Sequence, residues 1–81
     1  MTRSWAAEFS PSGVRVNAIA PGPVLTNGAA PDRIKALGAT TLLARAAQPG
    51  EIASLIAFLA SPKASYITGA VIAADGGRTA I

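Results

Sequence analysis

The sequence has no cysteine and no histidine among its 81 residues. The first absence excludes disulfides and thiolate metal ligands, and the second excludes imidazole ligands and the Ser-His and Cys-His pairs of nucleophilic catalysis. Carboxylates, lysine, tyrosine and hydroxyls remain for chemistry. Asp75, followed by two glycines, is a lone carboxylate, which is typical of a turn and not of a cation site. We therefore expect no metal site.

Charge is also sparse. Seven basic and four acidic residues give a formal net charge of +3, and the basic side chains are scattered along the chain without a run. Contact with phosphates requires clustered lysine and arginine, often with aromatic residues for base stacking, and only 5% of the residues are aromatic. The composition therefore argues against a nucleic-acid partner.

Long hydrophobic runs are missing as well. The longest apolar region, residues 52–74, is interrupted by Pro62 and Lys63, which are costly at the centre of a bilayer. The apolar run near the N-terminus is too short for a secretory signal. We expect no membrane partner and no export, and the lack of cysteine fits the reducing cytoplasm.

Helical and extended patterns alternate along the chain. Residues 2–9 place Trp5, Ala6 and Phe9 on one helical face, but the segment has no convincing N-cap and so resembles the last turns of a longer helix. Residues 14–20 are β-branched and nearly all apolar, as in a strand covered on both faces. The Pro-Gly-Pro at 21–23 must end that strand.

The second half repeats the alternation. Residues 49–60 form the clearest helix, with a proline in the first turn and an apolar stripe at i, i+3, i+4 and i+7. Residues 70–74 form a second buried strand. Between them and the first strand, residues 27–47 are irregular apart from a short helix at about 32–37, and they resemble a lid or substrate loop. Disorder of this loop in the free chain is the alternative.

The resulting order is helix, strand, long crossover with a helix, and strand. Strands joined by such a crossover are parallel, and the crossover itself is right-handed, which predicts an α/β fold. A two-stranded parallel sheet is not a natural endpoint, because parallel strands normally lie within larger sheets that carry helices on both faces. The chain therefore reads as one part of a larger sheet.

The motifs themselves point to a family. Residues 13–26, GVRVNAIAPGPVLT, are followed by residues 43–53 around LAR and PGEIA, by YITG at 66–69 and by DGG at 75–77. In this order they resemble the C-terminal segment of a classical short-chain dehydrogenase/reductase. The resemblance implies the C-terminal portion of a Rossmann-like, doubly wound parallel sheet. Residues 1–81 would then form a partial NAD(P)-binding domain, with residues 27–47 as its substrate loop.

The resemblance also implies a cofactor site. The loop after the first strand would lie beside the nicotinamide of NAD or NADP: Pro21 and Gly22 would let the backbone approach the ring, Val24 would hold the carboxamide with main-chain groups, and Thr26 would offer its hydroxyl. Ligands of open α/β sheets bind at this end of the strands. Taken without the family, the same residues are only a turn and a helix cap.

The departures from the family matter equally. Its glycine-rich phosphate loop, its catalytic serine and its Tyr-x-x-x-Lys element are absent, so we assign no catalytic residue. Tyr66 is followed four positions later by Ala70 and not by lysine, so we expect it to be structural. Asn17 in the first strand is expected to bond neighbouring backbone.

Two hypotheses follow. In the first, the chain is part of an NAD(P)-dependent oxidoreductase that moves hydride between a nicotinamide and a small carbonyl or alcohol, and it is inactive alone. In the second, it is a small non-catalytic interaction module derived from this fold. Family tetramers place the last helix and strand at a subunit interface, which implies a homo-oligomer for the complete member.

Overall fold

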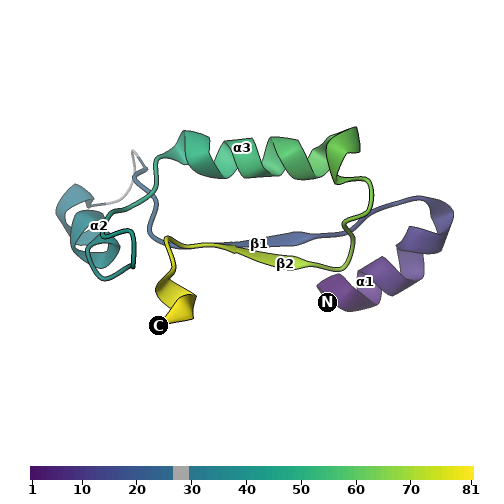
Figure 1. Cartoon of the computed structure of the whole chain (residues 1–81), viewed down its shortest axis with the longest axis horizontal. Coiled ribbons are helices and arrows are strands. Elements are labelled where there is room, and N and C mark those ends of the chain that lie inside the picture. Colours follow the sequence, from purple (N-terminus) through teal and green to yellow (C-terminus); the bar gives the residue numbers. More distant parts are fainter. Residues whose placement is uncertain (27–29) are drawn as a thin grey trace.

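A computed structural model of the chain describes residues 1–26 and 30–81. Helices and strands alternate along it as the sequence predicts (Figure 1). The elements are α1 (Thr2–Phe9), β1 (Ala18–Pro21), α2 (Pro31–Gly38), α3 (Pro49–Ala60) and β2 (Val71–Ala74), with 3-10 turns at Ser10–Ser12, Pro62–Ala64 and Arg78–Ala80.

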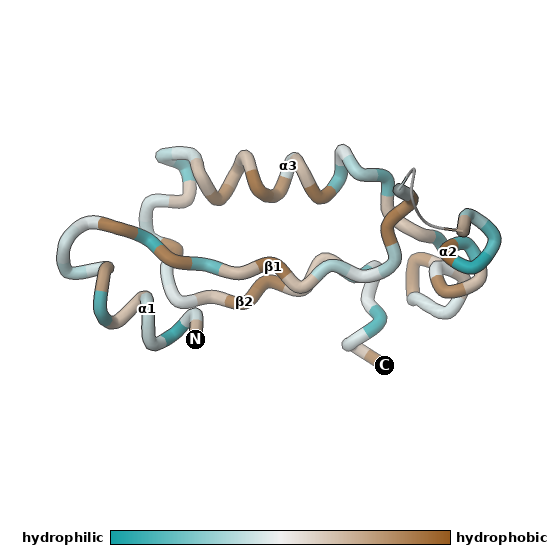
Figure 2. Tube along the Cα trace, turned by 180° about the vertical axis from the view of Figure 1, so that it is seen from behind, coloured by the Kyte–Doolittle hydropathy of each residue, from teal (hydrophilic) through white to brown (hydrophobic). Residues whose placement is uncertain are grey.

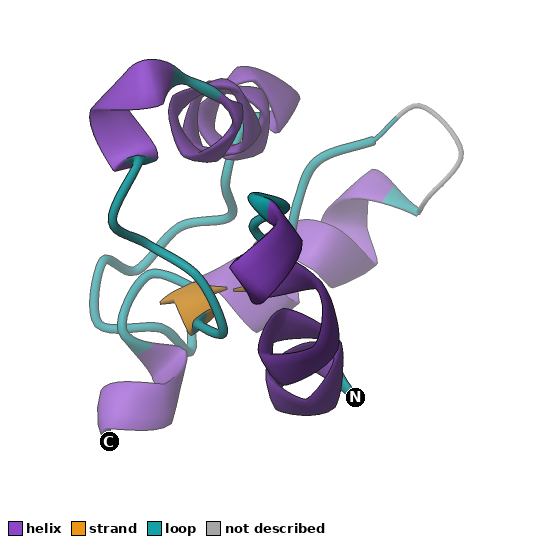
Figure 3. Cartoon of the chain, turned by 90° about the vertical axis from the view of Figure 1, so that its right-hand side faces the viewer, coloured by secondary structure: helices purple, strands orange, loops and turns teal. Residues whose placement is uncertain are grey.

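The two strands form a parallel sheet. Its register pairs Ala18 with Val71 at one end and Pro21 with Ala74 at the other. The α3 helix runs along one face of the sheet, and α1 lies on the opposite side (Figures 1 and 3). Helices on both faces of parallel strands define an α/β arrangement. The predicted fold class is thereby confirmed.

The first strand is shorter than predicted, because side-chain hydrogen bonds replace the backbone pairing in the first part of the predicted range. The prediction covered residues 14–20, whereas β1 begins at Ala18. Before it, the Val16 N–H donates to Thr68 Oγ1 at 3.1 Å. The Asn17 amide donates to the Ile67 carbonyl at 2.9 Å, and Asn17 Oδ1 accepts the Ala70 N–H at 3.1 Å. The expectation that Asn17 bonds backbone is therefore confirmed.

The helices begin and end close to the predicted positions. The α1 helix has the predicted bounds and no side-chain cap, and α2 exceeds the prediction by one residue at each end. The α3 helix begins at Pro49, where a missing N–H costs no hydrogen bond. Just before it, the Gln48 N–H donates to Glu51 Oε1 at 2.9 Å, so a carboxylate occupies the positive end of the helix.

The core is very small. The buried hydrophobic residues are Ala6, Ala46, Leu59 and Ala64, of which only Leu59 is large. The accessible surface is 5603 Å², whereas a folded monomer of this mass exposes about 4,500 Å². Hydrophobic residues lie along α3 and both strands (Figure 2). Much of this apolar surface is exposed, including Trp5, Phe9, Leu42, Leu43, Ile56, Phe58 and Val71.

Open space separates α3 from the sheet. A cavity of about 510 Å³ lies between Ile19 of β1 and Ile56 and Leu59 of α3. This space is open to solvent, so the facing side chains of α3 and β1 are not packed tightly against one another there. In the part of the chain that the structure describes, the longest helix has 12 residues, and no helix is long and apolar enough to cross a membrane.

The exposed apolar surface predicts self-association of the isolated chain. Trp5 is the sole tryptophan and is 45% exposed, so it reports on burial of the α1 face. We expect its fluorescence emission to shift to the blue, and light scattering to rise, as the chain is concentrated. A Glu8→Gln variant, altered at an exposed polar position of the same helix, serves as the control and should behave like the parent. Emission and light scattering that do not change with concentration would contradict this prediction.

Candidate functional site

The loop at residues 21–26 leaves the carboxyl end of β1 and is held on two sides. On one side, the Gly22 N–H donates to the Ala74 carbonyl at 3.1 Å. On the other, Val24 pairs in parallel fashion with Ala47. The Ala47 N–H donates to the Pro23 carbonyl at 2.8 Å, and the Leu25 N–H donates to the Ala47 carbonyl at 2.9 Å. The path of the loop is thus fixed by backbone from two distant segments.

The pairing with Ala47 does not use the N–H or C=O of Val24 itself. In a parallel pair the residues on either side of Val24 make the hydrogen bonds to Ala47, so the N–H and C=O of Val24 point away from Ala47. Among the hydrogen bonds between described residues, none uses either group. Thr26 is exposed two residues later. The loop therefore presents a main-chain donor, a main-chain acceptor and a hydroxyl at the carboxyl end of the sheet.

The structure gives a packing reason for a glycine at position 22 that the sequence did not reveal. A Cβ at this position would lie 2.8 Å from the Cα, 2.9 Å from the Cβ and 3.2 Å from the carbonyl oxygen of Asp75. Contacts this short are not tolerated, so residue 22 must be glycine for the chain to pass the end of β2. Pro21 is the last residue of β1 and is exposed. Any cofactor contact at Gly22 comes in addition to this packing requirement.

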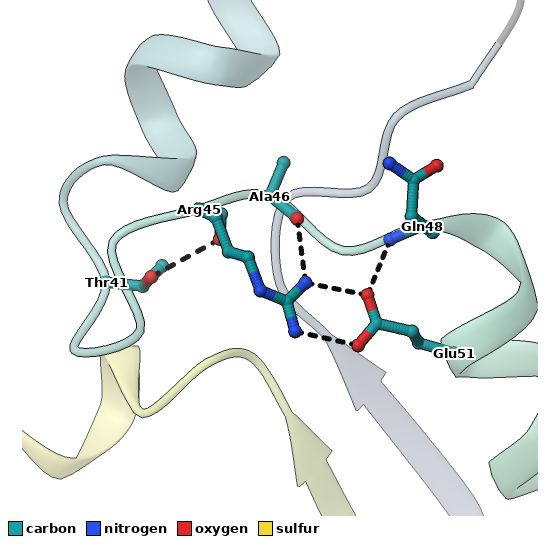
Figure 4. A network of polar contacts seen from close by, with 5 residues as sticks. All are labelled: Thr41, Arg45, Ala46, Gln48 and Glu51. Carbon is teal, nitrogen blue, oxygen red and sulfur yellow. Dashed lines mark hydrogen bonds and ion pairs between the residues drawn. The ribbon is translucent and has the colours of Figure 1, made fainter.

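An ion pair orders the segment that Val24 pairs with (Figure 4). The Arg45 guanidinium donates to both carboxylate oxygens of Glu51, at 2.7 and 2.9 Å, and to the Ala46 carbonyl at 3.2 Å. The same carboxylate accepts the Gln48 N–H. The hydrogen bond from Arg45 and then that from Gln48 lower the pKa of Glu51 to about 2. Both side chains are half exposed, so the pair fixes geometry more than it stabilises the fold.

This network was not anticipated from the sequence. Arg45 and Glu51 are six residues apart, across a loop and a helix start, so no helical spacing rule joins them. The only available signal was an acidic residue in the first turn of α3, which suggests an N-cap interaction and not a partner in the preceding loop.

The two remaining candidates, Asp75 and Tyr66, lie in different environments. Asp75 Oδ1 accepts the Gly77 N–H at 3.0 Å, and Oδ2 accepts the Thr79 hydroxyl at 2.8 Å and the Thr79 N–H at 3.2 Å. The bond from the Thr79 hydroxyl is the main cause of a lowered Asp75 pKa. The expected turn role of Asp75 is confirmed. Tyr66 is fully exposed, so no packing within the described chain tests the expected structural role.

A cavity of about 600 Å³ adjoins the loop. Pro23 and Ala47 line one side, Ile52 of α3 another, and the C-terminal turn at residues 75–77 a third. Arg45 and Glu51 reach its wall but are engaged with one another. Pro21, Gly22, Val24 and Thr26 do not line this cavity, and among the described residues that do line it none is a free general acid or base.

Comparison with known proteins identifies the family. Residues 1–79 match a family model described as enoyl-(acyl carrier protein) reductase. The chain is 46% identical to galactitol 2-dehydrogenase (L-tagatose-forming) of Cereibacter sphaeroides, over 98% of this chain and 33% of that protein. It is also similar to the crystal structure of a short chain dehydrogenase family protein from Francisella tularensis, with a TM-score of 0.88 and 37% identity, over 100% of this chain and 39% of that one. The chain belongs to the short-chain dehydrogenase/reductase family.

Two further solved structures of similar fold carry nicotinamide cofactors. One is 4-hydroxyisoleucine dehydrogenase complexed with NADH and succinate, with a TM-score of 0.84 and 35% identity, over 99% of this chain and 34% of that one. The other is a blue fluorescent protein from a metagenomic library in complex with NADPH, with a TM-score of 0.87 and 38% identity, over 96% of this chain and 32% of that one. The chain spans about a third of the length of the family members it matches.

The Arg45–Glu51 pair predicts an acid-sensitive loop. The pKa of Glu51 is lowered from 4.5 to about 2 in the folded chain, so its contribution to stability is complete above the unfolded value and is lost as the pH falls through about 2. Carboxyl chemical shifts measured by NMR should show this low midpoint. In an Arg45→Gln variant the midpoint should rise towards 4.5. An unchanged Glu51 titration in that variant would show that the pair does not form in solution.

The contact between Gly22 and Asp75 predicts opposite outcomes at two glycines. Gly22→Ala should lower the free energy of unfolding by about 1–3 kcal/mol, because the methyl group overlaps backbone atoms of Asp75. Gly50→Ala should raise it by up to about 1 kcal/mol, because this position lies in α3 with nothing within 4 Å of the new Cβ. Thermal unfolding followed by circular dichroism measures both. Equal effects at the two sites would refute the close packing.

Proposed function

We propose that this chain supplies the nicotinamide half of the cofactor site of an NAD(P)-dependent oxidoreductase. That enzyme transfers hydride between the nicotinamide and a small carbonyl or alcohol substrate. The observation that carries the proposal is that no hydrogen bond between described residues uses the N–H or C=O of Val24, which lie at the carboxyl end of β1. In open α/β sheets this is the end at which ligands bind.

The groups of the loop fit a carboxamide. A carboxamide has one carbonyl acceptor and one NH₂ donor, which match the N–H and C=O of Val24. The hydroxyl of Thr26 can bond the same amide or a nearby phosphate oxygen. Pro21 and Gly22 carry no long side chain, so the backbone before Val24 can lie close to a planar ring. The bound nicotinamide would supply or accept the hydride, and this chain would hold and orient the nicotinamide ring.

The chain supplies too little to act alone. A dinucleotide pyrophosphate requires the backbone donors of a glycine-rich turn and a helix N-terminus, and the sequence has no such motif. Proton transfer to a carbonyl requires a positioned acid, and the family's catalytic serine and Tyr-x-x-x-Lys are likewise not in the sequence. Relatives three times as long support the view that other residues provide these groups.

The segment at residues 27–47 is proposed as the substrate loop. Residues 27–29 lie outside the described residues, and the remainder contains α2 and the ordered stretch up to Ala47. The loop begins after Thr26 and ends at the residue that pairs with Val24, so it starts and finishes beside the proposed nicotinamide position. A substrate held there would lie next to the ring. Similar structures hold either NADH or NADPH, so the proposal covers both cofactors.

One observation favours the non-catalytic alternative. Leu42, Leu43, Tyr66 and Val71 are exposed, and monomeric proteins rarely leave this much apolar surface uncovered. A chain with such a surface can serve as an interaction module. A stable complex formed with an intact relative, without any effect on cofactor affinity, would favour this second function.

A chimera tests the proposed site. The C-terminal third of galactitol 2-dehydrogenase is replaced by this chain, to which it is 46% identical. We expect the chimera to bind reduced cofactor, measured by fluorescence titration with NADH and with NADPH. We expect the isolated chain to show neither binding nor hydride transfer. Thr26→Ala should weaken binding by about 0.5–1.5 kcal/mol, the value of one hydrogen bond.

A matched pair at Val24 provides the control. Val24→Pro removes the main-chain donor and should weaken cofactor binding, whereas Val24→Ala keeps both main-chain groups and should bind like the parent. Circular dichroism verifies that each variant is folded. If the Val24→Pro and Thr26→Ala variants are both folded and both bind reduced cofactor as tightly as the parent, this loop does not hold the nicotinamide. Turnover by the isolated chain, purified free of other enzymes, would contradict the proposed division of labour.

A further inference from the structure

The C-terminal turn, defined as residues 75–79, lies against both loops of the proposed site. On one side, backbone atoms of Asp75 lie so close to Gly22 that no side chain fits between them. On the other, the Leu43 N–H donates to the Gly76 carbonyl at 2.9 Å. The Arg78 guanidinium also donates to the hydroxyl of Thr40. The turn is thus the element that touches both the nicotinamide loop and the end of the substrate loop.

Two glycines make the second contact possible. A Cβ at Gly76 would lie 3.0 Å from Oγ1 and 3.2 Å from Cβ of Thr41, and one at Gly77 would lie 2.8 Å from Cβ and Cδ1 of Leu42. Their φ angles of 65° and 89° are open mainly to glycine. Asp75 fixes this conformation through its bonds to Gly77 and Thr79. The turn is therefore shaped to seat residues 40–43.

The contact continues into the substrate loop. Thr41 is buried, and its hydroxyl donates to the Gly38 carbonyl at the end of α2 at 2.8 Å. Gly38 in turn lies directly against the backbone of Ala46, because a Cβ there would be 2.2 Å from the Ala46 nitrogen. Close packing of this kind transmits displacements instead of absorbing them. A shift of the C-terminal turn must therefore move α2 and the loop with it.

We infer that the C-terminal turn positions the substrate loop relative to the nicotinamide loop, with Gly77 as the principal positioning residue. The inference rests on the proposed function of these two loops. Residues 75–79 need not touch cofactor or substrate themselves. The Val24–Ala47 pairing fixes the end of the substrate loop beside Pro21–Thr26, and the turn fixes the stretch at residues 40–43. Loosening the turn should therefore weaken substrate binding and leave cofactor binding intact.

The chain offers a matched control for this test. Gly77 and Gly13 have nearly the same φ angle, 89° and 88°, so alanine strains the backbone equally at either position. At Gly77 the new methyl group meets Leu42, whereas at Gly13 nothing lies within 4 Å. The difference between Gly77→Ala and Gly13→Ala therefore isolates the contact between the turn and the loop. Arg78→Met, which removes the donor to Thr40 and leaves the hydrogen bond from the Thr40 hydroxyl to the Leu37 carbonyl intact, provides a milder second variant.

Amide hydrogen exchange in the 81-residue chain reads the contact directly. The Leu43 amide bonds to Gly76, and the Ala18 amide, bonded to Ala70 in the sheet, is the internal reference. We expect Gly77→Ala to speed exchange at Leu43 by about tenfold relative to Gly13→Ala, with Ala18 equal in the two variants. Arg78→Met should act in the same direction and more weakly. An unprotected Leu43 amide in the parent, or equal exchange in the two alanine variants, would overturn the inference.

Kinetics of the chimera separate the inference from the proposed function. Gly77→Ala should raise the KM for the alcohol substrate by about tenfold over Gly13→Ala while the Kd for reduced cofactor stays the same. An unchanged KM in a chimera that binds cofactor would overturn the inference alone. A parental chimera that binds no reduced cofactor would instead overturn the proposed function, and with it the role assigned to the turn.

Discussion

Parallel pairing between β1 and β2 is the constraint on which the rest of the structure depends. The paired residues are more than fifty positions apart, so the sheet forms only after the long crossover has brought β2 alongside β1. Because the strands run in the same direction, both carboxyl ends meet at one edge of the sheet. The loop at residues 21–26 and the turn at residues 75–79 leave from that edge, which makes them neighbours.

Crowding at this edge explains why so many glycines lie there. Backbone passes backbone between Gly22 and Asp75, and between Gly38 and Ala46, at distances that leave no room for a side chain. Gly77 lies equally close to the side chain of Leu42. Such contacts hold loops in place without a large hydrophobic core. At Gly22 and Gly38 the packed neighbours are mostly main chain, which cannot move aside for an added methyl group.

The same architecture leaves the chain poorly covered. Among the described residues, Leu59 is the only large buried hydrophobic side chain, and an open groove lies between α3 and β1. Parallel sheets are normally covered on both faces, and here the helices on the two faces cover them only in part. The polar contacts around Arg45 and Glu51 are half exposed and cannot compensate for this deficit. The fold is therefore consistent with one portion of a larger layered domain.

Local patterns in the sequence were sufficient for the elements. The apolar stripe and the proline predicted the bounds of α3, and the Pro-Gly-Pro at residues 21–23 predicted the end of β1, because these signals act through neighbouring residues. Asn17 was correctly expected to bond backbone, although the segment it bonds, residues 67–70, was not identifiable.

Contacts between distant segments were decided by the tertiary structure alone. The bridge between Val24 and Ala47, the requirement for Gly22 beside Asp75, and the seat that Gly77 offers to residues 40–43 each join positions 23 or more residues apart. The direction of the Val24 N–H and C=O was likewise decided by the tertiary structure, since it depends on which neighbour Val24 pairs with. The sequence by itself determined which segments become helix, strand and turn, because those choices depend on local backbone preference and periodicity. Their meeting at one edge required the packed chain, because no local signal encodes the distance between two loops.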